Sequence, residues 1–249
     1  MKILSFNSSP FQPKTGSVNN ILLLAALCSV LFSCVSQKTY WPDPAVVPLH
    51  DKPGTMVQLY TIREPFGFGF SLASAFKFPV CMFVQGTYGS DNAKTTGLTH
   101  DAIVEKSELS SFNAAIGTYR VISKHFTAEA FAGIGSSSFE YTETGLFDEH
   151  IRLKARRYFL QTNLGFRREK IRIGASLRGT YLNPKSSIGI PQEQIRNHYY
   201  LEPSLTFKIG WGSNTSRFVY QFGRSVDVGK KPHLNHNHTF GLIGIEFGG

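Results

Sequence analysis

Apolar and polar positions alternate along most of the chain after residue 54, which is the pattern of β-strands with two different faces. The run 171–182 is the clearest example. Its odd-numbered positions are Ile, Ile, Ala, Leu, Gly and Tyr, whereas its even-numbered positions up to 180 are Arg, Gly, Ser, Arg and Thr. The runs 158–166, 198–211 and 217–225 repeat this alternation. We therefore expect strands that meet an apolar environment on one side and a polar environment on the other.

Counting such runs predicts about ten strands and no sustained helix after the first 33 residues. The expected strands are 55–62, 66–75, 80–88, 108–119, 126–139, 155–167, 171–182, 198–211, 217–228 and 238–247. The connections 89–107, 140–154, 183–197 and 229–237 are long and polar, whereas 76–79, 120–125, 168–170 and 212–216 are short. Long loops at one end and tight turns at the other are typical of outer-membrane barrels. The predicted fold class is all-β: a closed antiparallel up-and-down β-barrel of about ten strands that is transmembrane.

Alternation alone does not decide whether the apolar face meets lipid or a soluble core, so a lipocalin-like soluble barrel is the alternative. The polar face is rich in Gly, Ser, Thr, Asn and Gln, as expected for a crowded lumen. Aromatic residues lie toward strand ends on the apolar face, where interfacial girdles form: Tyr158, Phe166, Tyr181, Tyr199 and Trp211. The chain also ends in a strand with Ile243, Ile245 and Phe247 on one face. These features favour lipid outside the barrel.

The N-terminal region predicts export. The apolar run Ile21 to Phe32 has the length of a signal-peptide core and is too short to span a bilayer as a helix. Leu31-Phe32-Ser33-Cys34 resembles a bacterial lipobox, which implies that residues 1–33 are removed as a lipoprotein signal peptide and that Cys34 is acylated. An ordinary signal peptide cut near Ser33 is the alternative. Residues 34–54 contain four prolines and are predicted to form an extended linker to a barrel domain at 55–249.

Charge and cysteine content narrow the function classes. The formal net charge is +9, but Lys and Arg are scattered, which favours an anionic envelope surface over nucleic acid as a partner. Cys28 lies in the predicted signal peptide and Cys34 would carry lipid, so Cys81 would be the mature chain's single thiol. Its apolar surroundings predict a buried structural residue. Since no later segment is long and apolar enough for a transmembrane helix, a membrane-spanning domain must be a closed barrel.

Several short motifs together carry a family resemblance. They are the lipobox, Tyr40-Trp41-Pro42 with Val47-Pro48-Leu49, the strand Tyr158-Phe159-Leu160-Gln161-Thr162-Asn163-Leu164-Gly165 and the tripeptide Leu201-Glu202-Pro203. They resemble outer-membrane β-barrel lipoproteins of Gram-negative bacteria, a group without an assigned activity. The resemblance implies an outer-membrane location with a lipid anchor at Cys34. It implies no catalytic residue.

The charged residues predicted to face the lumen are the main candidate site. They are Glu129, Arg157, Arg172, Arg178, Glu202, Lys208, Arg217 and Glu246. In a narrow barrel these charges need partners, because unpaired buried charge is costly. A structural salt-bridge network is one interpretation, and a narrow polar pore or a small-ligand site is the other. Since basic groups outnumber acids in this set, the excess positive charge could hold an anionic ligand.

Other chemistry is weakly indicated. His233, His236 and His238 form a loop cluster with spacings that could capture Zn²⁺ or Cu²⁺, but no Cys or carboxylate stands close by. An acyl-modifying barrel enzyme could be assembled from His125 with Glu129 or from His198 with Ser204, although no spacing singles out a nucleophile. We predict no cofactor and no enzyme activity.

The sequence thus predicts a lipid-anchored outer-membrane β-barrel with a structural or interaction role at the cell envelope, a role that can include passing or binding a small solute. The expected partners are outer-membrane lipid and other envelope proteins. The alternative is a periplasm-facing lipoprotein with a soluble ligand-binding β-barrel.

Overall fold

A computed structural model describes residues 41–62, 66–96, 102–144, 150–190, 195–211, 215–229 and 239–248. All of its regular elements are strands: β1 (Gly54–Ile62), β2 (Gly67–Ala75), β3 (Val80–Thr96), β4 (Ala102–Val121), β5 (Phe126–Thr144), β6 (His150–Arg168), β7 (Ile171–Ile188), β8 (His198–Trp211), β9 (Ser216–Arg224), β10 (Val226–Asp227) and β11 (Thr239–Gly248). The described residues contain no helix long and apolar enough to cross a membrane.

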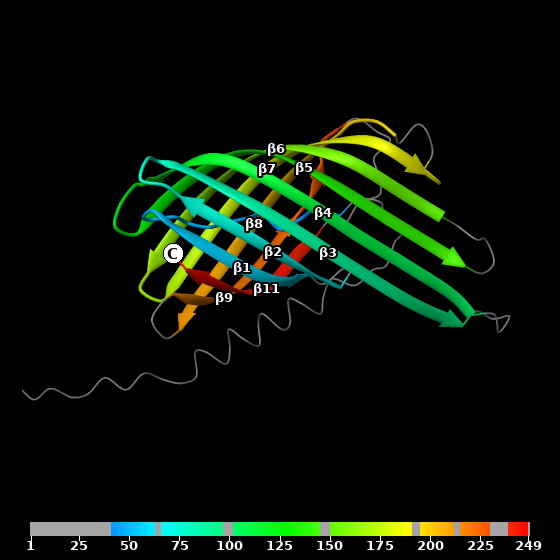
Figure 1. The fold of residues 1–249 in the computed structure, drawn as a ribbon, viewed down its shortest axis with the longest axis horizontal. Helices are drawn as coiled ribbons and strands as arrows, with labels where there is room; N and C mark the ends of the chain where they lie inside the picture. The colour runs from blue at the N-terminus through cyan, green and yellow to red at the C-terminus, as the bar shows by residue number, and fades with distance from the viewer. Residues whose placement is uncertain are drawn as a thin grey trace, which may run out of the picture. The chain divides into compact units, whose positions relative to one another are not determined.

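The strands close into a barrel (Figure 1). Each long strand pairs antiparallel with its neighbours in sequence, β11 pairs with both β1 and β9, and β8 pairs with β9. The two-residue β10 only adds a short pairing to β8. The predicted closed up-and-down barrel of ten main strands is therefore confirmed. We call the end that carries the connections 76–79, 122–125 and 169–170 the turn end, and the opposite end the loop end.

Over its central part the barrel is apolar outside, and its interior combines polar side chains with an apolar cluster around Phe83, Phe131 and Phe159. On β6, Leu160 and Leu164 face outward and are 70% and 61% exposed, whereas Gln161 and Asn163 face the lumen and are each 1% exposed. The apolar belt on β6 runs from Tyr158 to Phe166, about 27 Å along the strand. That length is close to the lipid-facing band of outer-membrane barrels. The assignment of the two faces is confirmed, and a soluble barrel with its apolar face inside does not fit this burial.

Aromatic side chains border the belt. The rings of Tyr158, Tyr181 and Tyr199 form a row across three neighbouring strands, with centroid distances of 6.0 Å and 5.1 Å. Near the turn end, the rings of Phe126 and Phe166 lie 5.3 Å apart. Such rows are typical of side chains placed at the two membrane interfaces. The belt therefore has a defined border toward each end of the barrel.

Several strands continue past the belt at the loop end, which corrects the predicted loops. The segments 89–107, 140–154 and 183–197 were expected to be irregular, yet β3 reaches Thr96, β5 reaches Thr144 and β7 reaches Ile188. The outward residues there are polar or charged, so the apolar-out alternation disappears while the strand pairing continues. The ladder of backbone hydrogen bonds does not depend on which side of the strand is apolar.

The inward face changes in the same region. Above the belt, a hydrophobic cluster fills the interior between β5, β6, β7 and β8, and Trp41 and Ile195 pack against it. We call this cluster the loop-end core. Its members are Phe139, Tyr141, Ile151, Leu153, Ala155, Leu182, Ile190 and Tyr200. The loop end of the barrel is therefore packed like a soluble protein.

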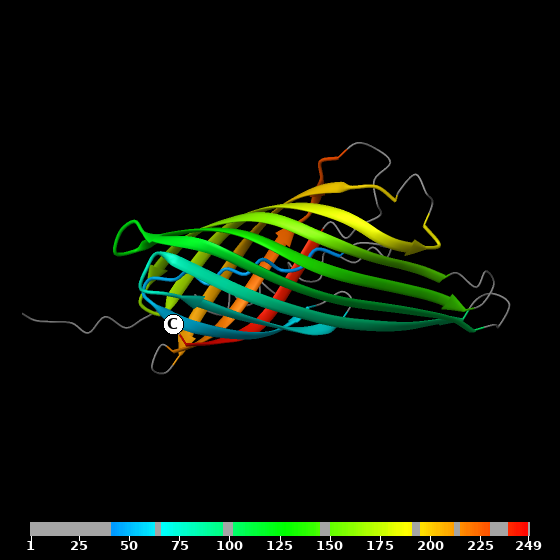
Figure 2. The ribbon, with the colours of Figure 1, turned by 45° about the horizontal axis from the view of Figure 1, so that its top comes forward.

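The described part of the predicted linker lies inside the barrel (Figure 1 and Figure 2). Residues 42–50 are all buried, and residues 41–54 belong to the same compact unit as the strands. Trp41 lies against the loop-end core, and Asp51 lies at the turn end beside Arg167, so the chain crosses the lumen before it turns into β1. Residues 41–51, which the sequence assigns to an extended linker, therefore lie within the barrel. We call these residues the lumen segment.

Candidate functional site: the occupied lumen

The lumen segment is held mainly through its backbone carbonyls. Side-chain amides donate to successive carbonyl oxygens: Gln85 to Pro44 at 2.9 Å, Gln221 to Ala45 at 3.0 Å and Gln161 to Val46 at 2.5 Å. Toward the turn end, Lys208 donates to the carbonyl of Pro48 at 3.3 Å and Arg172 to that of Leu49 at 3.4 Å. These donors come from β3, β6, β7, β8 and β9. Side chains from several sides of the barrel wall thus satisfy the backbone carbonyl groups of the segment.

Proline makes this mode of binding suitable for the segment. Pro42, Pro44 and Pro48 have no backbone N–H, so they cannot add a paired strand to the sheet, but their carbonyls still accept hydrogen bonds. Among the backbone hydrogen bonds recorded for the described residues, none joins the lumen segment to a strand. The barrel closes without the segment, and the segment occupies the space inside it.

Asp43 is the charged anchor of the segment. Its carboxylate pairs with the guanidinium of Arg157 and accepts hydrogen bonds from Asn113 at 2.8 Å and Ser111 at 2.7 Å. The carbonyl of Asp43 also accepts a hydrogen bond from Arg178. Asp43 and Arg157 are only 1% and 2% exposed. A buried carboxylate with a cation and two neutral donors is well satisfied.

Five of the eight predicted charged residues of the lumen are joined directly, in two groups. Arg178 Nε donates to Glu202 at 2.7 Å, and Thr180 donates to the same carboxylate at 2.8 Å. Glu246 accepts from both Lys208 and Arg217. All eight predicted members, namely Glu129, Arg157, Arg172, Arg178, Glu202, Lys208, Arg217 and Glu246, are buried. The network spans the polar interior of the barrel.

The sequence interpretation missed one acid of this network. Glu129 is bonded to the backbone N–H of His50 at 2.7 Å and to the side chain of Asn163 at 2.8 Å. Arg157 therefore needs an acid from elsewhere, and Asp43 supplies it. The excess of basic groups in the predicted lumen was the signal that could have revealed a missing carboxylate. Its source lay in a proline-rich stretch that showed no strand pattern.

Two glycines on adjacent strands make room for the segment. Gly165 and Gly174 are paired across β6 and β7. A Cβ on Gly165 would overlap the side chain of Leu49, and a Cβ on Gly174 would overlap that of Val47. Leu49 itself has φ 59°, which is uncommon for a residue other than glycine. The notch formed by the two glycines therefore fixes where the segment bends toward the turn end.

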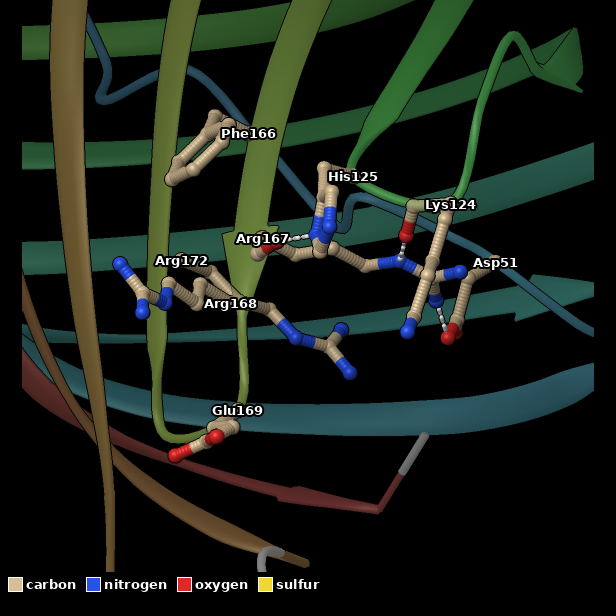
Figure 3. Close-up of a pocket in the computed structure, with 8 residues that line it drawn as sticks. All are labelled: Asp51, Lys124, His125, Phe166, Arg167, Arg168, Glu169 and Arg172. Atoms are coloured by element: carbon tan, nitrogen blue, oxygen red, sulfur yellow. Dashed lines mark hydrogen bonds and ion pairs between the residues drawn. The ribbon is translucent and has the colours of Figure 1, made fainter.

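A basic cavity of about 690 Å³ lies at the turn end of the lumen (Figure 3). Asp51 of the segment pairs there with Arg167, whose Nε donates to the carbonyl of Lys124 at 3.1 Å. The other lining residues are His125, Phe166, Arg168, Glu169 and Arg172. The cavity is an open mouth beside the last residue of the lumen segment.

The remaining candidates do not form a catalytic site. His125 lies in a turn and bonds to the carbonyl of Arg167, whereas Glu129 is inside the lumen. His198 pairs with Asp227 at 3.3 Å, and Ser204 lies six residues further along β8, about 20 Å away. Cys81 is buried, as expected.

Metal and lipid candidates fall largely beyond the described part of the chain. His233, His236 and His238 lie outside the described residues, as does Cys34. Within the described ranges, no group of three or more His, Cys, Asp or Glu residues could hold a metal ion.

Comparisons with known proteins find likeness in shape but not in sequence. No family model and no curated protein matches the sequence. The outer membrane protease OmpT from Escherichia coli is 8% identical with a TM-score of 0.49, covering 79% of this chain and 93% of its own. The translocator domain of the autotransporter NalP from Neisseria meningitidis is 10% identical with a TM-score of 0.42, covering 93% and 95%. The transport unit of the autotransporter AIDA-I from Escherichia coli is 10% identical with a TM-score of 0.44, covering 96% and 99%. The fold assignment for this chain rests on its own strand pairing.

Proposed function

We propose that this chain is a lipid-anchored outer-membrane β-barrel with a structural or interaction role at the envelope of a Gram-negative cell, and that its own lumen segment keeps the barrel shut. One observation carries the proposal: the wall is apolar toward the outside, while the polar interior is occupied by residues 41–51. An open porin-like lumen would leave its polar groups to water. Here side-chain amides of the wall donate hydrogen bonds to backbone carbonyl oxygens of the lumen segment.

The soluble ligand-binding barrel is the weaker alternative. It would expose Leu160, Leu164 and Phe68 to water, each more than 60% accessible, as part of a continuous apolar belt. Exposed apolar surface of that extent is typical of a membrane or protein interface. A tethered soluble barrel would also offer a central cavity to its ligand, and here the lumen segment occupies the interior up to the cavity at the turn end.

The sealed lumen is tested by conductance. Full-length protein, folded and purified, is placed in a planar bilayer and recorded with and without the substitution Asp43→Lys. We expect no steady conductance from the parent, because the lumen segment fills the channel. Asp43→Lys should introduce current, because it places a second cation against Arg157. Stable conductance from the unsubstituted protein would contradict the sealed lumen.

The anchor is tested by acylation. We infer that residues 1–33 are a signal peptide and that Cys34 carries the lipid, so Cys34→Ser should abolish incorporation of labelled palmitate and leave export intact. The matched control is Cys28→Ser, which changes a cysteine inside the predicted signal peptide. Undiminished labelling of Cys34→Ser would reject the lipid anchor and leave an ordinary exported barrel.

The path of the lumen segment bears on the side of the anchor. Only six residues separate Cys34 from Trp41, and the seven steps from one Cα to the next reach about 25 Å at most in an extended chain. Because Trp41 packs against the loop-end core, we infer that an acyl group on Cys34 enters the leaflet at the loop end. Whole-cell proteolysis of an epitope placed after Cys34 tests this inference. Protection equal to that of an epitope at Lys170, in a turn at the opposite end, would contradict it.

A further inference from the structure

A groove in the outer wall lies beside the border of the apolar belt at the loop end. It is a cavity of about 500 Å³ across β4, β5 and β6, with Lys185 of β7 at its side. We call it the serine-cation groove and define it by Ser110, Ser136, Ser138, Lys154, Arg156 and Lys185.

Strand register places these groups directly above the aromatic row. Ser136 is opposite Arg156, and Ser138 is opposite Lys154. On the same face of β6, Arg156 is followed two residues later by Tyr158, the first member of the row. Interfacial tyrosines mark the level of lipid headgroups. The groove therefore lies at headgroup height on the outside of the barrel.

The cations of the groove have no acidic partner among the described residues. No salt bridge is recorded for Lys154, Arg156 or Lys185, and all three are exposed. One row further from the membrane the arrangement differs, because Glu140 is bonded by His150 at 3.1 Å and paired with Arg152 at 3.3 Å. The cations nearest the belt are thus the ones without a counter-ion.

An irregularity in the sheet brings the third cation to the groove. The pairing of β6 with β7 shifts between Lys154 and Ala155, where Ser186 and Pro184 are the successive partners. Lys185 is therefore the extra, unpaired residue of a β-bulge. Bulges re-aim side chains and are common near functional sites. The outward Lys185 lines the same cavity as Lys154 and Arg156.

The donor chemistry suits a phosphate ester. A guanidinium binds two phosphate oxygens at once, an ammonium contributes charge, and serine hydroxyls add neutral donors. Phe112 lines the groove and is half exposed, and Ile134 faces outward opposite Tyr158, so apolar surface continues from the groove into the belt. A ligand with a phosphate above and acyl chains below would contact both parts.

We propose that the serine-cation groove is a binding site for the phosphate of a lipid headgroup in the leaflet at the loop end. This inference rests on the proposed membrane location and names the class of lipid that the outer wall selects. The lipid phosphate would supply the negative charge that the wall itself lacks at Lys154, Arg156 and Lys185.

The test uses full-length protein folded in neutral maltoside micelles. A short-chain phosphatidic acid is added as the probe, with the corresponding diacylglycerol and inorganic phosphate as separate arms, and bound lipid is counted by native mass spectrometry. The variant is Lys154→Ala with Arg156→Ala and Lys185→Ala. The matched control is Lys77→Ala with Arg120→Ala and Lys170→Ala, which removes the same charge from exposed sites at the turn end.

We expect the parent and the control to retain phosphatidic acid, and the groove variant to lose affinity by about tenfold or more, because charge-assisted bonds carry the binding. Neither diacylglycerol nor inorganic phosphate should bind comparably. Equal losses in both triple variants would overturn the proposal in favour of general charge attraction, and tight binding of inorganic phosphate would overturn the lipid assignment. Heat-modifiable mobility of the variants reports the barrel separately, so failure of the groove and failure of the membrane barrel are distinguishable.

Discussion

The central and loop-end parts of the barrel are built from the same strands but differ in the side chains that face outward and inward. On β6, the buried positions keep one phase from Ile151 to Gly165. In the loop-end part the buried residues are Ile151, Leu153 and Ala155, and the outward ones are charged. In the central part the buried residues are Arg157, Phe159, Gln161 and Asn163, and the outward ones are mostly apolar. The change occurs within a few residues.

The difference reflects the surroundings of the wall. Where lipid surrounds the wall, apolar side chains face outward and the lumen must satisfy polar groups internally. Where water surrounds the wall, apolar side chains are driven inward. The backbone pairing runs through both parts without a break. A single strand can therefore carry two burial rules, and each rule predicts a different response to substitution.

The largest effect is expected in the polar interior. Arg178→Met leaves Glu202 buried without its cation, and breaking such a pair costs about 3–5 kcal/mol of unfolding free energy. Urea unfolding from lipid vesicles measures the loss. The control Arg120→Met removes an exposed cation and should change stability by less than about 0.5 kcal/mol. Adding Glu202→Leu to Arg178→Met should recover part of the loss. Equal, small effects of both arginine substitutions would mean that the lumen is hydrated.

The next largest effect is expected at the middle of the apolar belt. Leu205 faces outward at the centre of β8, and an arginine there should cost about 2–4 kcal/mol. The same substitution at exposed Ile188, beyond the belt on β7, should be nearly neutral because water surrounds it. Heat-modifiable mobility after folding into vesicles reports both variants. Equal tolerance of arginine at the two positions would mean that the membrane border is not where the apolar belt ends.

A smaller loss is expected in the loop-end core. Leu182 is fully buried there, and Leu182→Ala should cost about 2 kcal/mol, at the low end for such changes. Phe139 and Tyr200 belong to the same cluster. Because this cluster lies outside the belt, the wall can relax into the space that the smaller side chain leaves. Ile188→Ala, on the exposed side, serves as the control and should lie within about 0.5 kcal/mol of the parent. A neutral Leu182→Ala would show that this part of the barrel has no packed core.

The smallest effect is expected at the turn end of the lumen segment. Asp51→Asn removes a partly exposed pair with Arg167, which contributes about 1 kcal/mol or less. Asp43→Asn, in the buried pair with Arg157, should cost several times more. Comparing the two in low and high salt separates them further, because salt screens the outer pair more strongly. A larger loss of stability for Asp51→Asn than for Asp43→Asn would mean that the Asp51–Arg167 pair at the turn end is the main attachment of the segment.

Sequence analysis recovers the central part of the barrel well. The alternation in 171–182 and 198–211 predicts both the strands and their faces, because lipid on one side and polar side chains on the other give a clear period of two. It also predicts the inward face for eight charged residues, all of which are buried. In the loop-end part the outward residues are polar and the signal weakens, so the ends of β3, β5 and β7 were predicted as loops.

The lumen segment could not be predicted from a periodic pattern. Among the described residues, no backbone hydrogen bond joins it to the sheet. Because it is not a strand of the wall, its side chains need not alternate between a lipid face and a lumen face. Its three prolines, with Pro53 just after it, make such a stretch look like a spacer. Its place is fixed by contacts with residues far along the chain, such as Asp43 with Arg157 and Ala45 with Gln221, and these depend on the closed barrel.

That dependence sets an order of assembly. The carbonyl of Ala45 bonds to a residue 176 positions later, on one of the last strands to be added. The barrel closes around the segment when β1, β11 and β9 pair. Residues 41–51 must therefore lie between the strands before this pairing, or enter the closed barrel from one end afterwards. Completion of the wall and occupation of its interior are thus coupled events. Damage to the segment should therefore appear as a shortage of assembled protein before it appears as a leaking cell.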